Sequence, residues 1–392
     1  MPKIYLDNAA ATQIDPKVME VVLSHTKKIY GNPSSIHEVG RKARLVIDNS
    51  RKTVADILNA SPPEIIFTGS GTESINLSIL GVARAYKKYG KHIITTEIEH
   101  KAVINSCHQL EKEGFKVTYL KVGKSGVVNL GDLRKTLKKD TILVSIMYAN
   151  NEIGTIQPIS KISKLLRDFR KRTFQVPRFK FHDKRLPIFH TDAIQAAGYL
   201  DLNVQKLGVD LMGLNGSKIY GPKGTGCLFV RRGTLLEPLN FGGSQEYGLR
   251  PGTEDPGLIA GFAKALEIVS KNKDKESKRL TKLRDYAISK ILKDILSSEL
   301  NGDPVLRLPN NINISFKDVD GEMLVLELDK SGVYVSTGSA CTTTETGPSH
   351  VLKSLGKKTG DNLRVTLGKH TTKKDIDYFI DVLERSVKKM KS

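Results

Sequence analysis

The stretch TILVSIMYANNEIG, residues 141–154, joins a nearly continuous apolar run to a cluster of polar residues. An apolar run without alternation is typical of a strand that is buried on both faces of a parallel sheet. The polar residues follow where the strand ends, and ligands bind beyond the carboxyl ends of the strands in such sheets. The stretch therefore predicts an α/β protein with a site at one edge of its sheet.

The same pattern recurs through the first two thirds of the chain. The predicted strands are EIIFTG (64–69), KHIITT (91–96), FKVTYL (115–120), TILVSIM (141–147), LPIFHTD (186–192), VDLMGL (209–214) and GCLFVRR (226–232). Segments with apolar residues at helical spacing lie between the first several of them. This alternation predicts a mainly parallel sheet of seven strands, covered by helices on both faces.

After about residue 257 the pattern changes to that of a smaller α+β unit. A long charged helical stretch (258–299) precedes NNINISF (310–316), a helix from Glu322, the segments GVYVSTG and LRVTLG, and a last helix from Thr372. We expect three parts: an N-terminal segment, 1–15, that joins the small domain; a large domain, 16–257; and a small C-terminal domain, 258–392.

Composition excludes several classes of protein. The chain has 392 residues, of which 39% are hydrophobic and 27% charged, as in ordinary globular proteins. No apolar run has the length of a membrane span, and the start lacks a signal-peptide core. Three cysteines argue against a disulfide framework and for a reducing, cytoplasmic location. Neither a CxxC pair nor HExxH is present, so no metal site is expected.

The formal net charge of +20 is concentrated partly in residues 167–187 and 271–282. Such charge attracts an anionic partner, for example RNA or an acidic protein, or it forms a solvated basic surface. The absence of an RNA-binding motif and of interleaved aromatic residues favours the solvated surface. For the segment around 167–187 we expect a helix end followed by an exposed loop.

The stretch GSGTES (69–74) predicts a helix that begins after a strand. Ser70 and Glu73 form a capping-box pattern, and Gly71 and Thr72 would present backbone N–H groups suited to a phosphate. Taken alone, the stretch fits a simple helix cap equally well. The third glycine of a dinucleotide fingerprint and a Walker-type motif are both missing, so neither NAD binding nor nucleotide triphosphate hydrolysis is supported.

Two further strand ends carry Asp192, in HTDAIQ, and Lys218, in NGSKIYGPKG. A carboxylate there can neutralise a cation, and a lysine amine can bind an aldehyde covalently. A lysine nucleophile, an acidic partner for a pyridinium nitrogen and a phosphate seat are what pyridoxal phosphate (PLP) requires. Their convergence at the strand ends of one sheet predicts a PLP site.

The sequence resembles the NifS/IscS-like cysteine desulfurases, in the class V group of the fold-type I PLP enzymes. The motifs that carry this resemblance run nearly end to end and agree in order and spacing. They are YLDNAAAT (5–12), GNPSSIH (31–37), FTGSGTESIN (67–76), IEHKAV (98–103), TILVSIMYANNEIG (141–154), HTDAIQ (190–195), KIYGPKG (218–224), RPGTED (250–255), VSTGSACT (335–342) and LRVTLGKHTT (363–372). The resemblance implies the fold-type I PLP-dependent transferase fold, with a large seven-stranded α/β domain and a smaller α+β domain.

The resemblance also implies roles for the matching residues. Lys218 would hold PLP and later move the proton of the substrate Cα, Asp192 would pair with the pyridine nitrogen, and Gln195 would contact the phenolic oxygen. His100 would stack on the ring and shuttle protons. The remaining implied contacts are those to the cofactor phosphate and to the substrate carboxylate. The phosphate would be bound by Gly71 and Thr72, and by Thr253 from the other subunit of a homodimer. The carboxylate would be bound by Asn151 and Arg364.

One part of the site departs from the family. Where the family usually has Ser-Gly-His before the lysine, this chain has Asn215-Gly216-Ser217. Both Asn215 and Ser217 can donate hydrogen bonds, so we expect the phosphate seat to persist with altered contacts.

The remaining implied residue is Cys341, which stands among small hydroxylated residues and glycines. The resemblance implies that it attacks the sulfur of L-cysteine, so that L-alanine leaves and a persulfide stays on the enzyme. A reactive thiol must be accessible, and a loop of such residues gives it mobility. The sulfur would pass to an iron–sulfur scaffold protein, or to tRNA or cofactor thiolation.

Two alternatives stay open. A related PLP enzyme, such as a selenocysteine lyase or an aminotransferase, shares most of these residues, although an aminotransferase needs no nucleophilic thiol. A non-catalytic sulfur-relay or RNA-binding adaptor would keep the fold, but the intact Lys218 and Asp192 speak against it.

Overall fold

The computed structural model describes residues 2–173, 185–338 and 347–391. A seven-stranded sheet forms its largest element, in the order β2–β8–β7–β6–β5–β3–β4. The strands are β2 (Ile65–Thr68), β3 (His92–Thr96), β4 (Lys116–Leu120), β5 (Thr141–Ser145), β6 (Ile188–Asp192), β7 (Leu211–Asn215) and β8 (Gly226–Val230). Strand β8 runs antiparallel to both of its neighbours, and the other pairs are parallel. All seven predicted strands and the mainly parallel sheet are confirmed.

Both faces of this sheet are buried, which explains the unbroken apolar runs of its strands. Neighbouring residues of one strand belong to different core clusters: Ile66 and Leu143 to one, Phe67 and Val144 to the other. Side chains alternate across a strand, so a sheet covered on both sides needs apolar residues at every position. The helices α3 (Gly71–Tyr86) and α4 (Lys101–Lys112) supply residues to the first cluster. Helices α2 (Glu38–Leu58) and α6 (Ile159–Thr173) supply residues to the second.

A smaller unit gathers around a three-stranded sheet, β12–β10–β9. Its strands are β9 (Ser298–Leu300), β10 (Asn311–Phe316) and β12 (Asn362–Thr366), and α9 (Gly321–Lys330) and α11 (Lys373–Lys391) cover them. Strand β1 (Ile4–Tyr5) pairs in parallel with β11 (Val333–Tyr334). The N-terminal segment thus packs with this unit, and Ile4 and Leu6 belong to its core cluster.

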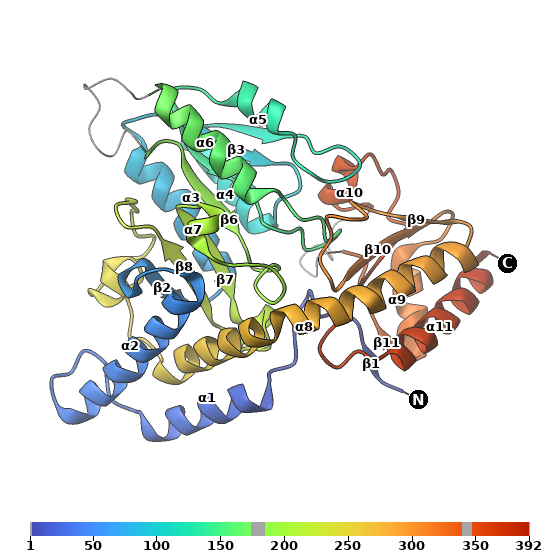
Figure 1. Cartoon of the computed structure of the whole chain (residues 1–392), viewed down its shortest axis with the longest axis horizontal. Helices are drawn as coiled ribbons and strands as arrows, with labels where there is room; N and C mark the ends of the chain where they lie inside the picture. The colour runs from blue at the N-terminus through green and yellow to red at the C-terminus, as the bar shows by residue number, and fades with distance from the viewer. Residues whose placement is uncertain (1, 174–184, 339–346, 392) are drawn as a thin grey trace.

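Helix α8 (Pro256–Asp294) connects the two cores and runs along the molecule (Figure 1). Its residues from Ile259 to Val269 pack with the large sheet, and those from Leu280 to Ile291 pack with the small one. The helix begins at the cap residue Asp255, whose side chain accepts the N–H of Leu258. It ends before the predicted residue 299, because Ser298–Leu300 pair with β10 instead. The domain limits between residues 15 and 16 and between residues 257 and 258 remain a prediction.

The remaining helices are short or lie at the periphery. Helix α1 (Pro16–Lys28) packs against α8, and α5 (Leu130–Thr136), α7 (Val204–Leu207) and α10 (His350–Ser354) sit in connections. Within residues 2–173, 185–338 and 347–391, no helix combines the length and the apolar character needed to cross a membrane.

The predicted helix end near residue 170 is confirmed, since α6 ends at Thr173. The expected loop after it falls mostly in 174–184, outside the described residues. Within the basic stretch 167–187, Arg170 differs from the exposed Lys171 and Arg172. Its side chain is 15% exposed and forms an ion pair of 2.6 Å with Asp210, and it also donates to the carbonyl of Pro187. Arg170 therefore fastens α6 to the sheet.

Candidate active site

A cavity lies beyond the carboxyl ends of β5, β6 and β7, and encloses about 730 Å³ between protein atoms, open solvent included. It brings together eight of the residues that the sequence singled out. These are Thr72, His100, Asn151, Asp192, Gln195, Asn215, Lys218 and Arg364. Four of its lining residues were not predicted: Ala9, Ala10, Met147 and Ile194.

Asp192 ends strand β6 with its side chain at the cavity. The residue is 5% exposed, and one carboxyl oxygen accepts the N–H of Ile194 at 2.9 Å. Burial raises the pKa of Asp192 to about 6, against the lowering effects of that hydrogen bond and of the Lys218 charge. A cation placed against this buried carboxyl would stabilise its ionised form.

Lys218 follows β7 in a short 3₁₀ turn, Gly216–Lys218. Its ammonium donates to the carbonyl of Ala10, and Gln195 Nε2 donates to the carbonyl of Ala9 at 3.1 Å. The N-terminal segment therefore forms one wall of the cavity. Its motif YLDNAAAT was recognised in the sequence, but no role was assigned to it.

His100 is the N-cap of α4, where Nδ1 accepts the N–H of Ala102 at 3.1 Å. Burial, together with the charges of Lys218 and His350, lowers the pKa of His100 to about 4. The imidazole is therefore neutral near pH 7. A neutral ring can lie against an aromatic ligand, and since Nδ1 is an acceptor here, Nε2 carries the proton and is a hydrogen-bond donor.

The preceding residue, Glu99, was missed in the sequence and is fully buried behind the site. Its carboxyl accepts the hydroxyl of Thr96 at 2.7 Å and the N–H of Met147 at 3.0 Å. Burial raises the pKa of Glu99 to about 8, and the charge of Asp192 contributes. Glu99 ties the start of α4 to the end of β5 and so fixes His100. An acidic residue beside the predicted histidine was the only sequence signal.

The predicted cap of α3 by Ser70 is confirmed, whereas the Glu73 half of the capping box binds the residue before the cap. Ser70 Oγ accepts the N–H of Glu73 at 3.1 Å, and Glu73 reaches back to the N–H of Gly69 at 2.6 Å. Gly71 is closely packed, since a Cβ there would lie 2.3 Å from Ile194 Cδ1 and 3.2 Å from Asn215 Cβ. The chain after Asp192 thus lies against the first turn of α3, and Thr72 of that turn lines the cavity.

Asn215 and Ser217, which replace the family's usual residues, are bonded to each other. Ser217 donates both its N–H and its hydroxyl to Asn215 Oδ1, at 3.0 and 3.1 Å. Asn215 lines the cavity, whereas Ser217 is not among the residues of its wall.

Arg364, on β12, reaches the cavity with only 1% of its side chain exposed. Its Nη2 donates to Asp7 at 2.8 Å and its Nη1 to the carbonyl of Asn151 at 3.2 Å. Its Nε is buried and has no hydrogen-bond partner among the described residues. The role of Asp7 could not be predicted, because only folding brings it beside Arg364.

Thr253 lies apart from this cavity, in a second one that Gly69, Glu246 and Arg250 also line. Arg250 links the two regions through an ion pair of 3.1 Å with Glu73, in the first turn of α3. The loop before Thr253 is held by the buried pair Arg51–Glu246, whose shortest N–O distance is 2.5 Å.

Cys341 falls in 339–346, outside the described residues. The chain on either side of that segment adjoins the cavity. Before it, the N–H of Ser336 donates to the carbonyl of Arg364 at 3.2 Å, and after it His350 Nε2 donates to the carbonyl of Glu99 at 2.8 Å. The other two cysteines, Cys107 and Cys227, are fully buried, and burial raises the pKa of both thiols.

The donor set fits PLP. A primary amine, a buried carboxyl with a raised pKa, a neutral imidazole and the first turn of a helix face one cavity. These groups match an aldehyde, a pyridinium nitrogen, an aromatic face and a phosphate. Across residues 2–173, 185–338 and 347–391, no group of three or more His, Cys, Asp or Glu side chains is placed to hold a metal ion.

Comparisons with known proteins agree with this arrangement. The model of the family "Aminotransferase class-V" matches residues 4–379. A cysteine desulfurase IscS from Dictyoglomus turgidum is 47% identical over 393 residues, which cover 100% of this chain and 96% of that relative.

Solved structures give the same result. A NifS-like protein has a TM-score of 0.88 and 36% identity, with 98% of this chain and 99% of that one covered. A structure titled "SspA in complex with cysteine" has a TM-score of 0.79 and 32% identity, with 95% and 100% covered. The chain therefore belongs to the class V aminotransferase family and, within it, to the cysteine desulfurases.

Proposed function

We propose that this protein is a PLP-dependent enzyme that converts L-cysteine to L-alanine and keeps the sulfur as a persulfide on Cys341. The observation that carries the proposal is the single cavity lined by Lys218, Asp192, His100 and Arg364. Class V aminotransferases and cysteine desulfurases are PLP enzymes, and the relative SspA is solved in complex with cysteine.

The cofactor would be held by the residues that match its groups. Lys218 would bind its aldehyde, Asp192 its pyridinium nitrogen, and Gln195 its phenolic oxygen, while Gly71, Thr72 and Asn215 would face its phosphate. Bound PLP supplies an electron sink for the pair that remains when the substrate Cα loses its proton. The positive pyridinium would also offset the cost of burying the Asp192 carboxylate.

The chain's own side chains position the substrate and move its protons. The Arg364 guanidinium, with Asn151, would hold the substrate carboxylate, which places Cα toward Lys218. The Lys218 amine, once released, would take the proton from Cα. His100 is neutral near pH 7, and because its Nδ1 accepts the N–H of Ala102, its Nε2–H would donate a hydrogen bond at the same site.

The sulfur transfer would be a displacement at the substrate sulfur. The thiolate of Cys341 forms a new S–S bond to that sulfur while the bond between sulfur and Cβ breaks. Its electron pair stays with the carbon fragment, which gains a proton at Cβ and leaves as alanine. Cys107 and Cys227 do not suit this role, because they are buried and their pKa values are raised.

The enzyme would act as a homodimer. Three large apolar residues, Tyr30, Ile36 and Phe241, are 81%, 91% and 90% exposed. Two of the segments that carry them contribute Ser34 and Ser244 to the wall of one cavity. Large apolar side chains that are exposed on neighbouring segments support an interface there. It lies near the loop of Thr253, which would reach the phosphate of the partner's cofactor.

The persulfide would pass to sulfur-acceptor proteins, such as an iron–sulfur scaffold protein, or toward tRNA or cofactor thiolation, in the cytoplasm. A preference for selenocysteine over cysteine is measurable by comparing alanine release from the two substrates.

Mass spectrometry after incubation with L-cysteine tests the central step. We expect an added sulfur on Cys341 in the wild type and none in Cys341→Ser. Persulfide on Cys107 or Cys227 instead would overturn the assignment of Cys341. Absorbance of bound PLP tests the cofactor: a colourless protein that PLP cannot reconstitute would favour the non-catalytic adaptor.

As a variant for the cofactor site, Asp192→Ala should weaken PLP binding about 30-fold or more, because it removes one partner of a buried charge pair. Titration of the apoprotein with PLP, followed by absorbance, measures this change. An unchanged affinity would remove Asp192 from the cofactor site.

A further inference from the structure

Glu152 is a buried carboxyl beside the candidate site that has no role in the steps above. It follows Asn151 in the polar segment after β5, and it is 1% exposed. Its carbonyl accepts the side-chain N–H groups of Asn311 and Asn313, at 3.0 and 3.1 Å. Both asparagines belong to β10 of the small sheet, so the backbone of Glu152 is held firmly at the contact of the two units.

The carboxyl of Glu152 contacts the chain on both sides of the segment 339–346. Ser349 Oγ donates to Glu152 Oε2 at 2.6 Å, within the range of a hydroxyl bonded to a carboxylate. Gly338 lies against the same oxygen, because a Cβ on Gly338 would lie only 3.3 Å from it. One buried oxygen atom is therefore the common neighbour of both flanks.

The flanks also bond to Arg364 of the site and to helix α10. Before the segment, the N–H of Arg364 donates to the carbonyl of Ser336 at 2.6 Å. After it, Ser349 caps α10, accepting the N–H of Leu352 at 3.2 Å, so its hydroxyl joins this helix to Glu152. Loss of the Glu152 carboxyl would release the end of the segment that Ser349 anchors.

We propose that Glu152 is a positioning residue for sulfur transfer: its carboxyl anchors one flank through Ser349, packs beside the other at Gly338, and so positions Cys341 for the reaction. The inference rests on the proposed function, because it concerns delivery of the Cys341 thiol. Cys341 is the third residue after Gly338 and the eighth before Ser349, so both anchors are close to it in the chain. Reacting atoms must come within about 3.5 Å in alignment, and small displacements cost rate steeply.

The test separates delivery of the thiol from substrate binding. In Glu152→Ala and in Ser349→Ala, the rate of persulfide formation on Cys341 in a single turnover should fall about tenfold or more. The affinity for L-cysteine, measured from the change in PLP absorbance on mixing, should stay unchanged. Glu152→Gln keeps an acceptor oxygen for Ser349 and should retain most of the rate.

The chain offers a matched control and an additivity test. Ser354 is another serine of α10, whose hydroxyl donates to the carbonyl of His350 and does not bond to Glu152. Ser354→Ala should transfer sulfur at the wild-type rate. The double variant Glu152→Ala/Ser349→Ala should be no slower than the slower single variant, because both changes remove one interaction.

Several outcomes would overturn the inference. The first is persulfide formation at the wild-type rate in Ser349→Ala. This result would be decisive even if Glu152→Ala failed to fold. The second is a loss of affinity for L-cysteine by the same factor as the loss of rate. The third is a strictly additive loss of rate in the double variant. Absence of persulfide on Cys341 in the wild type would instead contradict the proposed function, so the two failures are distinguishable.

Discussion

Asp7 and Arg364 form an ion pair at the edge of the cavity, with 2.8 Å between Oδ1 and Nη2. The pair joins the N-terminal segment to strand β12 across 357 positions of the chain. The guanidinium is 1% exposed, so its charge needs a partner when no substrate carboxylate is bound. Asp7 thus orients the arginine that would receive the substrate.

The first prediction concerns this pair. Asp7→Ala should lower the free energy of unfolding by about 3 kcal/mol, because it leaves a buried guanidinium without its counter-charge. Urea denaturation of the wild type and the variant measures the change. The matched control is Lys52→Ala, which breaks an exposed pair with Asp56 and should cost less than about 0.5 kcal/mol. Equal costs for the two variants would show that Asp7 does not stabilise the buried arginine.

The second prediction is a pH dependence. The pKa of Glu99 is about 8 in the folded protein against an ordinary value of 4.5. Between these values the folded state keeps a proton that the unfolded chain releases, so the contribution of Glu99 to stability falls as pH rises. It is fully present below pH 4.5 and lost by about pH 8.

Glu99→Gln removes this titration and should flatten the decline of the free energy of unfolding between pH 5 and pH 8, by up to about 1.4 kcal/mol per pH unit. Urea denaturation of both proteins at each pH, in the same cofactor state, provides the comparison. Parallel curves for the wild type and the variant would mean that Glu99 is ionised throughout.

The third prediction uses two glycines. Gly71→Ala places a methyl group 2.3 Å from Ile194 Cδ1 and should destabilise the protein by about 1–3 kcal/mol and weaken PLP binding. Gly198→Ala is the matched control, since its Cβ would meet no atom within 4 Å. Adding Ile194→Val removes the methyl group that clashes and should restore part of both losses. Thermal denaturation and PLP titration measure them, and failure of the second change to rescue the first would reject this packing argument.

The fourth prediction concerns the basic end of α6. Arg170 is occupied by Asp210, whereas Lys171 and Arg172 are exposed. If these two contact an acidic sulfur acceptor, Lys171→Gln with Arg172→Gln should slow persulfide transfer to the acceptor, most strongly at low salt, and spare turnover of free cysteine. Equal transfer rates for the double variant and the wild type would dismiss the contact.

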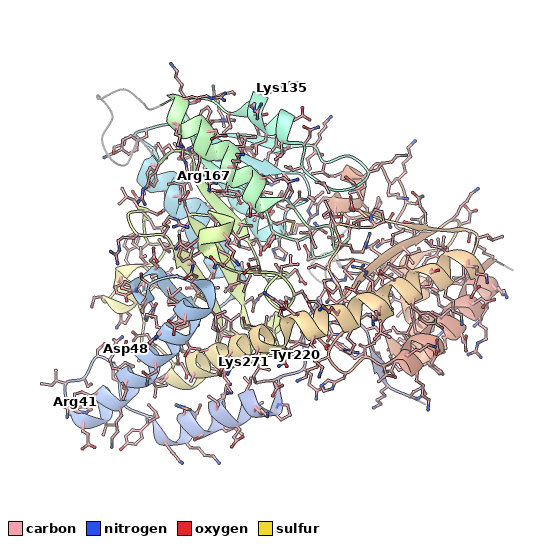
Figure 2. All side chains as sticks on the ribbon, viewed as in Figure 1. Arg41, Asp48, Lys135, Arg167, Tyr220 and Lys271 are labelled. Carbon is pink, nitrogen blue, oxygen red and sulfur yellow. The ribbon has the colours of Figure 1, made fainter. Side chains whose placement is uncertain are left out.

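A control for this double variant is a basic residue on another surface of the protein. Lys271 lies on α8 (Figure 2), its side chain is 72% exposed, and it pairs with Glu267 of the same helix at 2.5 Å. Lys271→Gln should therefore leave acceptor transfer unchanged.

Much of the fold could be predicted because its signals are local. The apolar runs of the seven strands follow from burial on both sheet faces, and the cap of α3 follows from Ser70 and Glu73. The starts of α9 and α11 lie within one residue of the predicted Glu322 and Thr372. The predicted end of α8 was too late, because pairing of β9 with β10 overrides helical propensity there.

The sequence by itself determined the class of fold, the family and the side chains that carry the chemistry. The patterns behind these predictions, namely strand burial, helix capping and motif spacing, each involve only residues that are close together in the chain. Tertiary structure alone decided which distant residues meet: Asp7 with Arg364, Ala10 with Lys218, and Glu152 with Ser349. It also decided the protonation states of Asp192, His100 and Glu99, because burial, rather than residue type, shifts their pKa values most. Desolvation and long-range contact exist only once the chain has closed around the cavity.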